Sequence, residues 1–232
     1  MNLRKSENRC RTLNKNTSVA SGGPGKRQSH GTGRQKQVVV ISGPSGVGKT
    51  TVCDYLISRE PRLKPCVTAT TRPMRKGEIN GRDYLFLNRN SFIEGIKNRK
   101  FVEYTRIFGH YYGTPVDSLE SVFSEGKYPL LRIDVKGAGQ LRQKGYQGVF
   151  IFILPPDAEA LKRRLVNRRS EKSQAELNRR LRRAGREMRY SRDYDFQVVN
   201  DKISRAVEEI RNILKKYLTL PGLPSCRGKR SG

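Results

Sequence analysis

Residues 37–57 decide the fold, and they read QVVVISGPSGVGKTTVCDYLI from Gln37 to Ile57. The β-branched run at the start of this stretch is typical of a buried parallel strand. The apolar spacing from Thr51 onward is helical. Between them, Gly43-Pro-Ser-Gly-Val-Gly-Lys-Thr50 matches the eight-residue phosphate-loop pattern, with both glycines, the lysine and the hydroxyl in place. A strand, a glycine loop and a helix in this order are the context that a phosphate loop requires.

This loop predicts a binding site for a nucleoside triphosphate. Glycines allow successive backbone N–H groups to turn inward around phosphate oxygens, and the following helix points its positive end at the same anion. Lys49 can then reach the β- and γ-phosphates, and the Thr50 hydroxyl can bind Mg²⁺. The pattern does not identify the phosphate acceptor. The predicted ATP-binding residues of the loop are Gly43, Pro44, Ser45, Gly46, Val47, Gly48, Lys49, Thr50 and Thr51.

Further strands alternate with helical segments along the rest of the chain. Residues 129–135 and 148–154 are short apolar runs of the buried-strand type, and residues 196–199 precede an amphipathic helix over about 203–217. Alternating strands and helices predict an α/β fold with a parallel sheet. The segment 67–120 breaks this rhythm with a polar turn and short aromatic strands, so we expect it to be an insertion.

Length and composition narrow the class of protein. The 232 residues suit one domain with small inserted elements, and no apolar run reaches the 18 or so residues of a membrane span. The four cysteines are scattered, which favours a reducing compartment and argues against a zinc site. With only two histidines, His30 and His110, histidine-based catalysis is not expected.

The net charge of +27 is unevenly distributed. Residues 1–37 carry nine basic residues and one acid, residues 219–232 add three basic residues, and residues 38–218 hold the remaining +16. Within the last range, residues 162–192 contain thirteen basic residues against three acids. The excess therefore lies in the two ends and in one helical segment.

The stretch Thr68-Ala-Thr-Thr-Arg-Pro-Met-Arg-Lys-Gly-Glu-Ile-Asn-Gly-Arg-Asp-Tyr84 resembles the nucleoside monophosphate segment of guanylate kinases. Phe101-Val-Glu103, Gly109-His-Tyr-Tyr-Gly-Thr114 and Val198-Val-Asn-Asp201 are similar to further blocks of that family, and the likeness runs from about Val38 to Tyr217. The resemblance implies a P-loop NTPase fold with a parallel sheet core flanked by helices, an inserted GMP-binding subdomain and a mobile helical lid. It also implies a nucleoside monophosphate kinase of purine nucleotide metabolism, which transfers the γ-phosphoryl group of ATP to GMP or dGMP with Mg²⁺.

This resemblance divides the chain into parts. We expect a basic leader over residues 1–36, a guanylate kinase-like domain over 37–218 and a flexible tail over 219–232. Within the domain, the core covers 37–66, 126–155 and 188–218, the GMP-binding part covers 67–125, and the lid covers 156–187.

The acceptor chemistry can also be argued from the residues. Arg72 and Arg75, three positions apart, form with the hydroxyls of Tyr84 and Tyr112 a plausible clamp for the GMP phosphate. Guanine presents its N1–H and exocyclic amine side by side, so that one carboxylate can accept both hydrogen bonds. Adenine lacks this pair, and a buried carboxylate left unpaired would reject AMP by a factor of up to ~10⁴. The resemblance gives this role to Glu103, and it places Thr68, Glu78, Thr114 and Asp134 in the same GMP pocket and Asn200 at ATP.

The basic segment is expected to form the lid. The resemblance places Arg164, Arg168 and Arg180 where lid arginines reach the triphosphate, and with Lys49 they form the predicted catalytic set. Phosphoryl transfer depends mainly on charge neutralisation and positioning, and lid closure would keep water out. We expect the other cations of the segment to be a solvated surface; they include Arg163, Arg169, Arg182, Arg183, Arg186 and Arg189.

Two positions depart from the family pattern. Arg132 stands where an acid is usual, two residues before a second acid at Asp134, and Lys136 stands where glutamine is usual. A cation at position 132 either weakens metal binding or points elsewhere. The predicted metal ligands are therefore Thr50 and Asp134.

Alternatives stay open for the ends and for the function. The leader is either an organelle transit peptide, for a plastid or a mitochondrion, or an uninformative solvated tail of a cytoplasmic protein.

Three alternative functions stay open. The chain could be a phosphopeptide-binding module, like the guanylate kinase-like modules of scaffold proteins. The charge alone suggests a nucleic-acid binder, and another nucleoside monophosphate kinase is the nearest enzyme alternative. We expect small-molecule substrates only, with no membrane or required nucleic-acid partner, in a monomer or weak homodimer.

Overall fold

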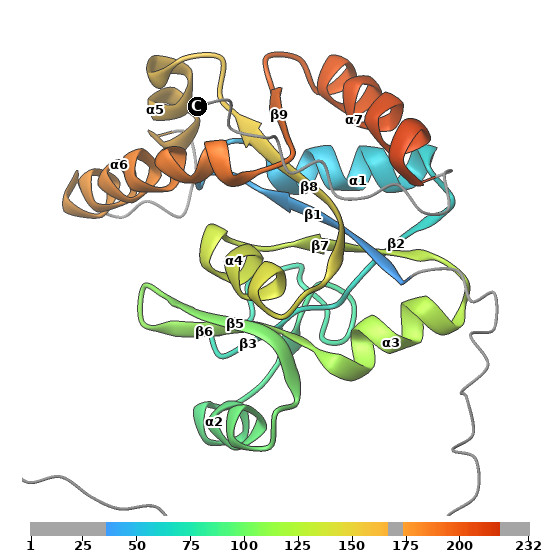
Figure 1. The fold of residues 1–232 in the computed structure, drawn as a ribbon. Helices are drawn as coiled ribbons and strands as arrows, with labels where there is room; N and C mark the ends of the chain where they lie inside the picture. Colours follow the sequence, from blue (N-terminus) through green and yellow to red (C-terminus); the bar gives the residue numbers. More distant parts are fainter. Residues whose placement is uncertain (1–35, 167–173, 219–232) are drawn as a thin grey trace, which may run out of the picture. The chain divides into compact units, whose positions relative to one another are not determined.

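A five-stranded parallel sheet forms the centre of the protein in the computed structural model, which describes residues 36–166 and 174–218. The strand order is β2-β7-β1-β8-β9, and every neighbouring pair is parallel (Figure 1). This order brings β1 between β7 and β8, so that the segment before the phosphate loop is the middle strand. The strands are β1 (Gln37–Ser42), β2 (Leu63–Pro65), β7 (Tyr128–Arg132), β8 (Gln147–Leu154) and β9 (Phe196–Val199).

Helices cover both faces of this sheet. On one face, α1 (Lys49–Arg59) and α7 (Ile203–Leu218) share an apolar cluster with β1, β8 and β9. On the other face, α3 (Val116–Ser124) and α4 (Val135–Gln143) share a second cluster with β1, β7 and β8. Figure 1 shows these two layers with the sheet between them.

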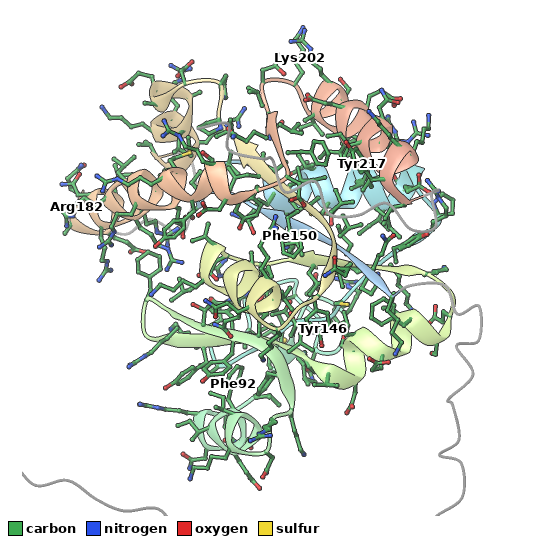
Figure 2. The ribbon with its side chains drawn as sticks, viewed as in Figure 1. Phe92, Tyr146, Phe150, Arg182, Lys202 and Tyr217 are labelled. Atoms are coloured by element: carbon green, nitrogen blue, oxygen red, sulfur yellow. The ribbon has the colours of Figure 1, made fainter. Side chains whose placement is uncertain are left out.

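The middle strand explains the continuous apolar run in the sequence. Val39 and Ile41 face the α1–α7 cluster, whereas Val38 and Val40 face the α3–α4 cluster, and all four are fully buried. Because successive side chains point to opposite faces, a strand that is covered on both sides needs an apolar residue at every position. On the neighbouring strand β8, Phe150 lies on the same face as Val38 and Val40, toward α4 (Figure 2).

A second, smaller sheet is inserted between β2 and α3. Its strand order is β4-β3-β6-β5, and its own apolar cluster contains Ala69, Phe92 and Phe101. The Phe92 ring stacks on that of Phe101 with centroids 4.4 Å apart. The elements are β3 (Ala69–Thr70), β4 (Leu85–Phe86), α2 (Arg89–Lys97), β5 (Phe101–Ile107) and β6 (His110–Pro115).

Two further helices pack on each other beyond β8. They are α5 (Ala158–Val166) and α6 (Gln174–Met188), and their shared cluster contains Leu161, Leu165, Leu177 and Ala184. The 3₁₀ helix η1 (Arg189–Asp193) then leads to β9. This pair has its own small apolar core, as expected for a unit that packs separately from the sheet.

The expected α/β architecture is confirmed, including strands at 37–41, 148–154 and 196–199 and the final helix. The apolar run at 129–135 is a strand only as far as Arg132, because Asp134 caps α4, which begins at Val135. β2 was not predicted, since three residues with a central lysine give no apolar run. None of the helices in the described part of the chain is long and apolar enough to cross a membrane.

Alanine substitutions at two glycines should change stability in opposite directions. A Cβ at Gly148 would lie 1.9 Å from the Val38 carbonyl oxygen, so Gly148→Ala would force β8 away from β1. We expect this variant to lose about 3 kcal/mol or more of unfolding free energy. A Cβ at Gly139, inside α4, meets nothing within 4 Å, and Gly139→Ala should gain about 0.5–1 kcal/mol. Urea denaturation of both variants measures the difference, and equal stabilities would contradict the strand contact.

Candidate active site

One cavity of about 470 Å³ joins the phosphate loop, the inserted sheet and the α5–α6 pair. It lies at the carboxyl ends of β1 and β7, where open α/β sheets bind their ligands. Its lining residues are Gly43, Ser45, Gly46, Gly48, Lys49, Thr50, Thr51, Thr68, Arg72, Arg75, Tyr84, Glu103, Thr105, Ile107, Phe108, Tyr112, Arg132, Ile133, Asp134, Arg164, Arg180, Arg183 and Glu187.

The phosphate loop needs its glycines for both conformation and space. Gly43, Gly46 and Gly48 have φ angles of 149°, 85° and 97°, in the region that disfavours other residues. Gly48 also precedes α1 and gives it no side-chain cap. The first N–H groups of α1 are therefore available to an anion, as a phosphate site requires.

Lys49 lies at the first turn of α1 and reaches back across the loop. Its amino group donates hydrogen bonds to the carbonyl oxygens of Gly43 and Pro44, the latter at 2.9 Å. Burial lowers the pKa of Lys49 to about 8, while Glu187 opposes this effect and Arg132 adds to it. Phosphate oxygens would give this amino group stronger partners than neutral carbonyls do.

Asn200 and Arg164 donate hydrogen bonds that support the backbone of the phosphate loop. The Asn200 amide donates to the Val47 carbonyl at 2.8 Å, and the Arg164 guanidinium donates to the carbonyls of Val47 and Asn200 at 3.2 and 2.9 Å. A Cβ at Gly48 would lie 2.5 Å from the Asn200 amide nitrogen. Asn200 thus supports the backbone of the phosphate loop, and Arg164 ties α5 to it.

Arg72 is held rigidly in the inserted sheet. Its guanidinium donates to both carboxylate oxygens of Glu78 and lies over the rings of Tyr84 and Phe86, at 4.9 and 5.5 Å from their centroids. The Glu78 partner raises the pKa of Arg72. Glu78 also accepts a hydrogen bond from the Arg75 backbone N–H at 2.8 Å.

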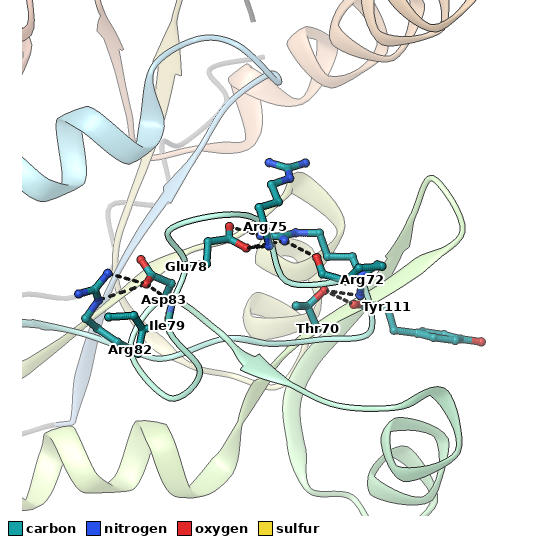
Figure 3. A network of polar contacts seen from close by, with 9 residues as sticks. Thr70, Arg72, Arg75, Glu78, Ile79, Arg82, Asp83 and Tyr111 are labelled. Carbon is teal, nitrogen blue, oxygen red and sulfur yellow. Dashed lines mark hydrogen bonds and ion pairs between the residues drawn. The ribbon is translucent and has the colours of Figure 1, made fainter. Parts of the chain in front are cut away.

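The side chain of Arg75 is oriented differently. In Figure 3 its guanidinium points away from the Glu78 carboxylate, and Arg75 lines the cavity. Tyr84 and Tyr112 lie beside it in the lining and pack edge to face with centroids 6.2 Å apart. Two arginines and two phenols therefore meet at one end of the cavity, where they suit a phosphate dianion.

Glu103 is buried, with 1% of its surface exposed. One carboxylate oxygen accepts a hydrogen bond from the Thr114 hydroxyl at 2.7 Å, and the other faces Gly137, where a Cβ would come within 2.4 Å of it. Burial raises the pKa of Glu103 to about 7, and the nearby charge of Asp134 adds to this rise. The importance of Gly137 is not visible in the sequence, because no local pattern shows that its missing side chain makes room for the Glu103 carboxylate.

Asp134 begins α4 and is surrounded by donors. One oxygen accepts from the Gly137 backbone N–H at 2.9 Å, and the other accepts from the Thr105 hydroxyl at 3.2 Å and from Arg183 at 3.1 Å. Arg183 also bonds Glu187 at 2.6 Å. The expectation that Arg183 is a surplus solvated cation is wrong, since it joins two acids of the cavity. The spacing of Arg180, Arg183 and Glu187 on one helical face was a signal that could have indicated this.

Arg132 does not point away from the site. It ends β7 next to Ile41 of β1, lines the cavity and depresses the pKa of Lys49. Lys136, by contrast, is exposed on α4. Among the described residues no group of three or more His, Cys, Asp or Glu side chains could hold a metal ion. Thr50 is exposed and lines the cavity, so its hydroxyl fits a Mg²⁺ ion that arrives with ATP, whereas both oxygens of Asp134 already have partners.

Most of the residues selected from the sequence line this one cavity. Thr68 and Arg180 are among them, and Arg180 is paired with Glu176 at 2.7 Å. Five others do not line it but support residues that do, and they are Pro44, Val47, Glu78, Thr114 and Asn200. Arg168 lies outside the described residues, as do the leader up to residue 35 and the tail. The lining residues that were not expected at the site from the sequence are Thr105, Ile107, Phe108, Arg132, Ile133, Arg183 and Glu187.

A protein-family model described as "Guanylate kinase" matches residues 35–217 of the chain. Curated proteins named "Guanylate kinase" are similar along most of their length. The protein of Caldanaerobacter subterraneus subsp. tengcongensis is 42% identical over 181 residues, which cover 78% of this chain and 87% of the relative. The protein of Geobacter sulfurreducens is 43% identical over 181 residues, covering 78% and 89%.

A solved structure shows the same fold. It is the crystal structure of guanylate kinase from Anaplasma phagocytophilum, which is 31% identical and superposes with a TM-score of 0.66, covering 81% of this chain and 89% of the other.

The buried carboxyl of Glu103 predicts a pH-dependent stability. Its pKa rises on folding from the ordinary 4.5 to about 7, so the folded protein binds more protons than the unfolded chain between these values. Stability should therefore fall as the pH rises from 4.5 to 7, by about 3 kcal/mol in total. Glu103→Gln, which keeps an acceptor for Thr114, should lose this dependence. Urea denaturation at pH 5 and pH 8 measures the change in unfolding free energy for both proteins. The same change in the wild type and in Glu103→Gln would contradict the raised pKa.

Proposed function

Because the chain belongs to the guanylate kinase family, a nucleoside monophosphate kinase family, we propose that it transfers the γ-phosphoryl group of ATP to GMP, and more slowly to dGMP. The resemblance drawn from the sequence is confirmed at the level of the family. The observation that carries the choice of GMP is the buried carboxylate of Glu103, held by Thr114 in the same cavity as an intact phosphate loop.

The acceptor would bind to the inserted sheet. Arg72, Arg75, Tyr84 and Tyr112 suit its dianionic phosphate, and Glu78 keeps the Arg72 guanidinium in place so that little entropy is lost on binding. The ionised Glu103 would accept hydrogen bonds from the guanine N1–H and amino group. Since its pKa is about 7 in the free protein, binding of GMP should weaken as the pH falls below that value.

ATP would bind to the phosphate loop. Lys49 would exchange the carbonyls of Gly43 and Pro44 for the β- and γ-phosphates, and the new anionic partners would raise its pKa from about 8. Thr50 would hold Mg²⁺, and when bound this ion would supply positive charge that offsets the charge of the ATP phosphates.

The transfer needs charge and alignment, and no protein nucleophile. An oxygen of the GMP phosphate forms a bond to the γ-phosphorus as the bond to the bridging oxygen of ADP breaks. Lys49 and the lid arginines Arg164 and Arg180 would neutralise the charge of the transferred group, while Arg132 adds a cation that the family pattern does not include. In this proposal residues 67–125 form the acceptor subdomain and residues 156–187 form the lid.

We expect ADP release with GMP and ATP, and little with AMP, CMP or UMP, when the four monophosphates are compared at pH 8. At this pH the Glu103 carboxyl is ionised. Glu103→Gln should lose most of the preference for GMP over AMP, because one amide cannot accept both guanine donors. A coupled ADP assay measures both. Equal rates with AMP would contradict the guanine assignment, and no turnover with any acceptor would favour a binding module.

Lys49→Ala is the control for a contaminating kinase in that assay. It removes the cation of the phosphate loop and should lower kcat by more than ~10²-fold. The folded state should persist, since removing Lys49 leaves the glycine conformations of the loop intact. Full activity in this variant would mean that the measured turnover belongs to another protein.

We propose further that the basic leader directs the protein to an organelle, a plastid or a mitochondrion. The support is its composition alone, which is rich in hydroxyl and basic residues and poor in acids. A fluorescent fusion of the full chain should localise to an organelle, and a fusion that lacks residues 1–36 should be diffuse. A diffuse signal from the full-length fusion would contradict the proposal.

A further inference from the structure

Phe108 lies at the tip of the β5–β6 hairpin. Ile107 and His110 pair across the two strands, so Phe108 and Gly109 form a two-residue turn. The Phe108 side chain is 41% exposed and lines the cavity, although the apolar cluster of the inserted sheet lies elsewhere. A large apolar side chain in this position does not serve the core of its own subdomain.

The backbone of this turn disfavours phenylalanine. Phe108 and Gly109 have φ angles of 47° and 89°, the pattern of a type I′ turn, in which asparagine or glycine is preferred at the first central position. This conformation is strained for phenylalanine and persists only where surrounding structure compensates. The turn therefore needs a tertiary partner for its ring.

The partner is the lid helix α6. The guanidinium carbons of Arg179, Arg180 and Arg183 lie 5.3, 5.7 and 5.4 Å from the centroid of the Phe108 ring. These distances are within the range of cation–π attraction. Three cations of one helix thus gather around a single ring that belongs to the acceptor subdomain.

Arg183 extends this contact to the core. Besides facing Phe108, it donates to the Asp134 carboxylate at 3.1 Å and to Glu187 at 2.6 Å. Asp134 caps α4 through the Gly137 N–H, so its position is fixed by the core. The helix α6 is therefore held both at the tip of the hairpin and at the start of α4.

We propose that Phe108 and Arg183 are positioning residues that hold the lid helix over the acceptor subdomain and thereby favour phosphoryl transfer over hydrolysis of ATP. This inference rests on the proposed function, since the lid must serve a transfer reaction. Neither residue needs to touch the reacting atoms. Arg180 lies in the cavity wall beside them, and a lid held in this way would keep water away from the transfer.

Phe108→Asn separates this role from the stability of the turn. Asparagine suits the positive φ angle, so the melting temperature should stay the same or rise. The ratio of transfer with GMP to ATP hydrolysis without acceptor should fall roughly tenfold, because three weak cation–π contacts are lost at once. Phe108→Tyr, which keeps the ring, should retain the wild-type ratio. An unchanged ratio in Phe108→Asn would overturn the inference.

Arg183→Gln should have the same effect, and its combination with Phe108→Asn should be little worse than either variant alone, because both act through one contact. Arg182→Gln is the matched control: Arg182 is the preceding residue of α6, and it is exposed on the outer side of the helix (Figure 2). It should behave as the wild type. Fully additive losses of the transfer-to-hydrolysis ratio in the double variant, or an equal loss in Arg182→Gln, would contradict the proposed role of Phe108 and Arg183.

Hydrogen exchange of the substrate-free, full-length protein tests the contact without catalysis. Amides of residues 107–110 should exchange faster in Arg183→Gln than in the wild type and remain unchanged in Arg182→Gln. Unchanged exchange in Arg183→Gln would overturn the inference even if the protein converts GMP. Absence of GMP turnover in the wild type would instead contradict the proposed function, and the exchange result would still decide whether the contact exists.

Discussion

The uncapped start of α1 is the feature on which the rest of the structure depends. Its free N–H groups and positive helix end form an anion site only if the preceding loop keeps three glycines at positive φ. Each glycine is pressed by a different element. A Cβ at Gly43 would meet the Ile153 carbonyl of β8 at 2.5 Å, one at Gly46 would meet Leu165 of α5 at 2.8 Å, and one at Gly48 would meet Asn200. The sheet, α5 and the β9–α7 connection therefore all converge on this loop.

The cavity carries opposite charges at close range, and the substrate-free protein reduces their cost in two ways. Asp134 and Glu187 are paired with Arg183, and Arg72 is paired with Glu78. Where pairing is weaker, burial shifts the proton equilibrium: the pKa of Lys49 falls to about 8 and that of Glu103 rises to about 7. Both shifts follow from the cost of holding a charge away from water. Phosphates would give Lys49 anionic partners in place of two neutral carbonyls, and a guanine edge would give Glu103 donors in addition to Thr114.

Part of the site could be predicted because the relevant residues are close in sequence and their chemistry is local. The phosphate loop, the strand before it and the helix after it follow from glycine spacing and apolar periodicity. The resemblance assigned Arg72 and Glu78, six residues apart in one loop, to the same pocket, and the structure adds that they form a bidentate pair. The pairing of Arg183 with Asp134 and the role of Gly137 could not be found in this way, because Asp134 and Glu103 come from distant segments. Asn200 was predicted to bind ATP, and in the structure its side-chain amide donates to the backbone of the phosphate loop at Val47.

The sequence by itself determined the class of fold, the succession of most strands and helices along the chain and the triphosphate loop, since these depend on side-chain periodicity and on the backbone freedom of glycine. Through residues 68–84 it also indicated the protein family. Only the tertiary structure decided which charges meet. Thirteen basic residues in the segment 162–192 look alike in sequence, but burial and the positions of Asp134, Glu187 and Phe108 distinguish Arg183 from exposed Arg182. The physical reason is that charge pairing and desolvation depend on distances between remote segments, and local sequence does not set those distances.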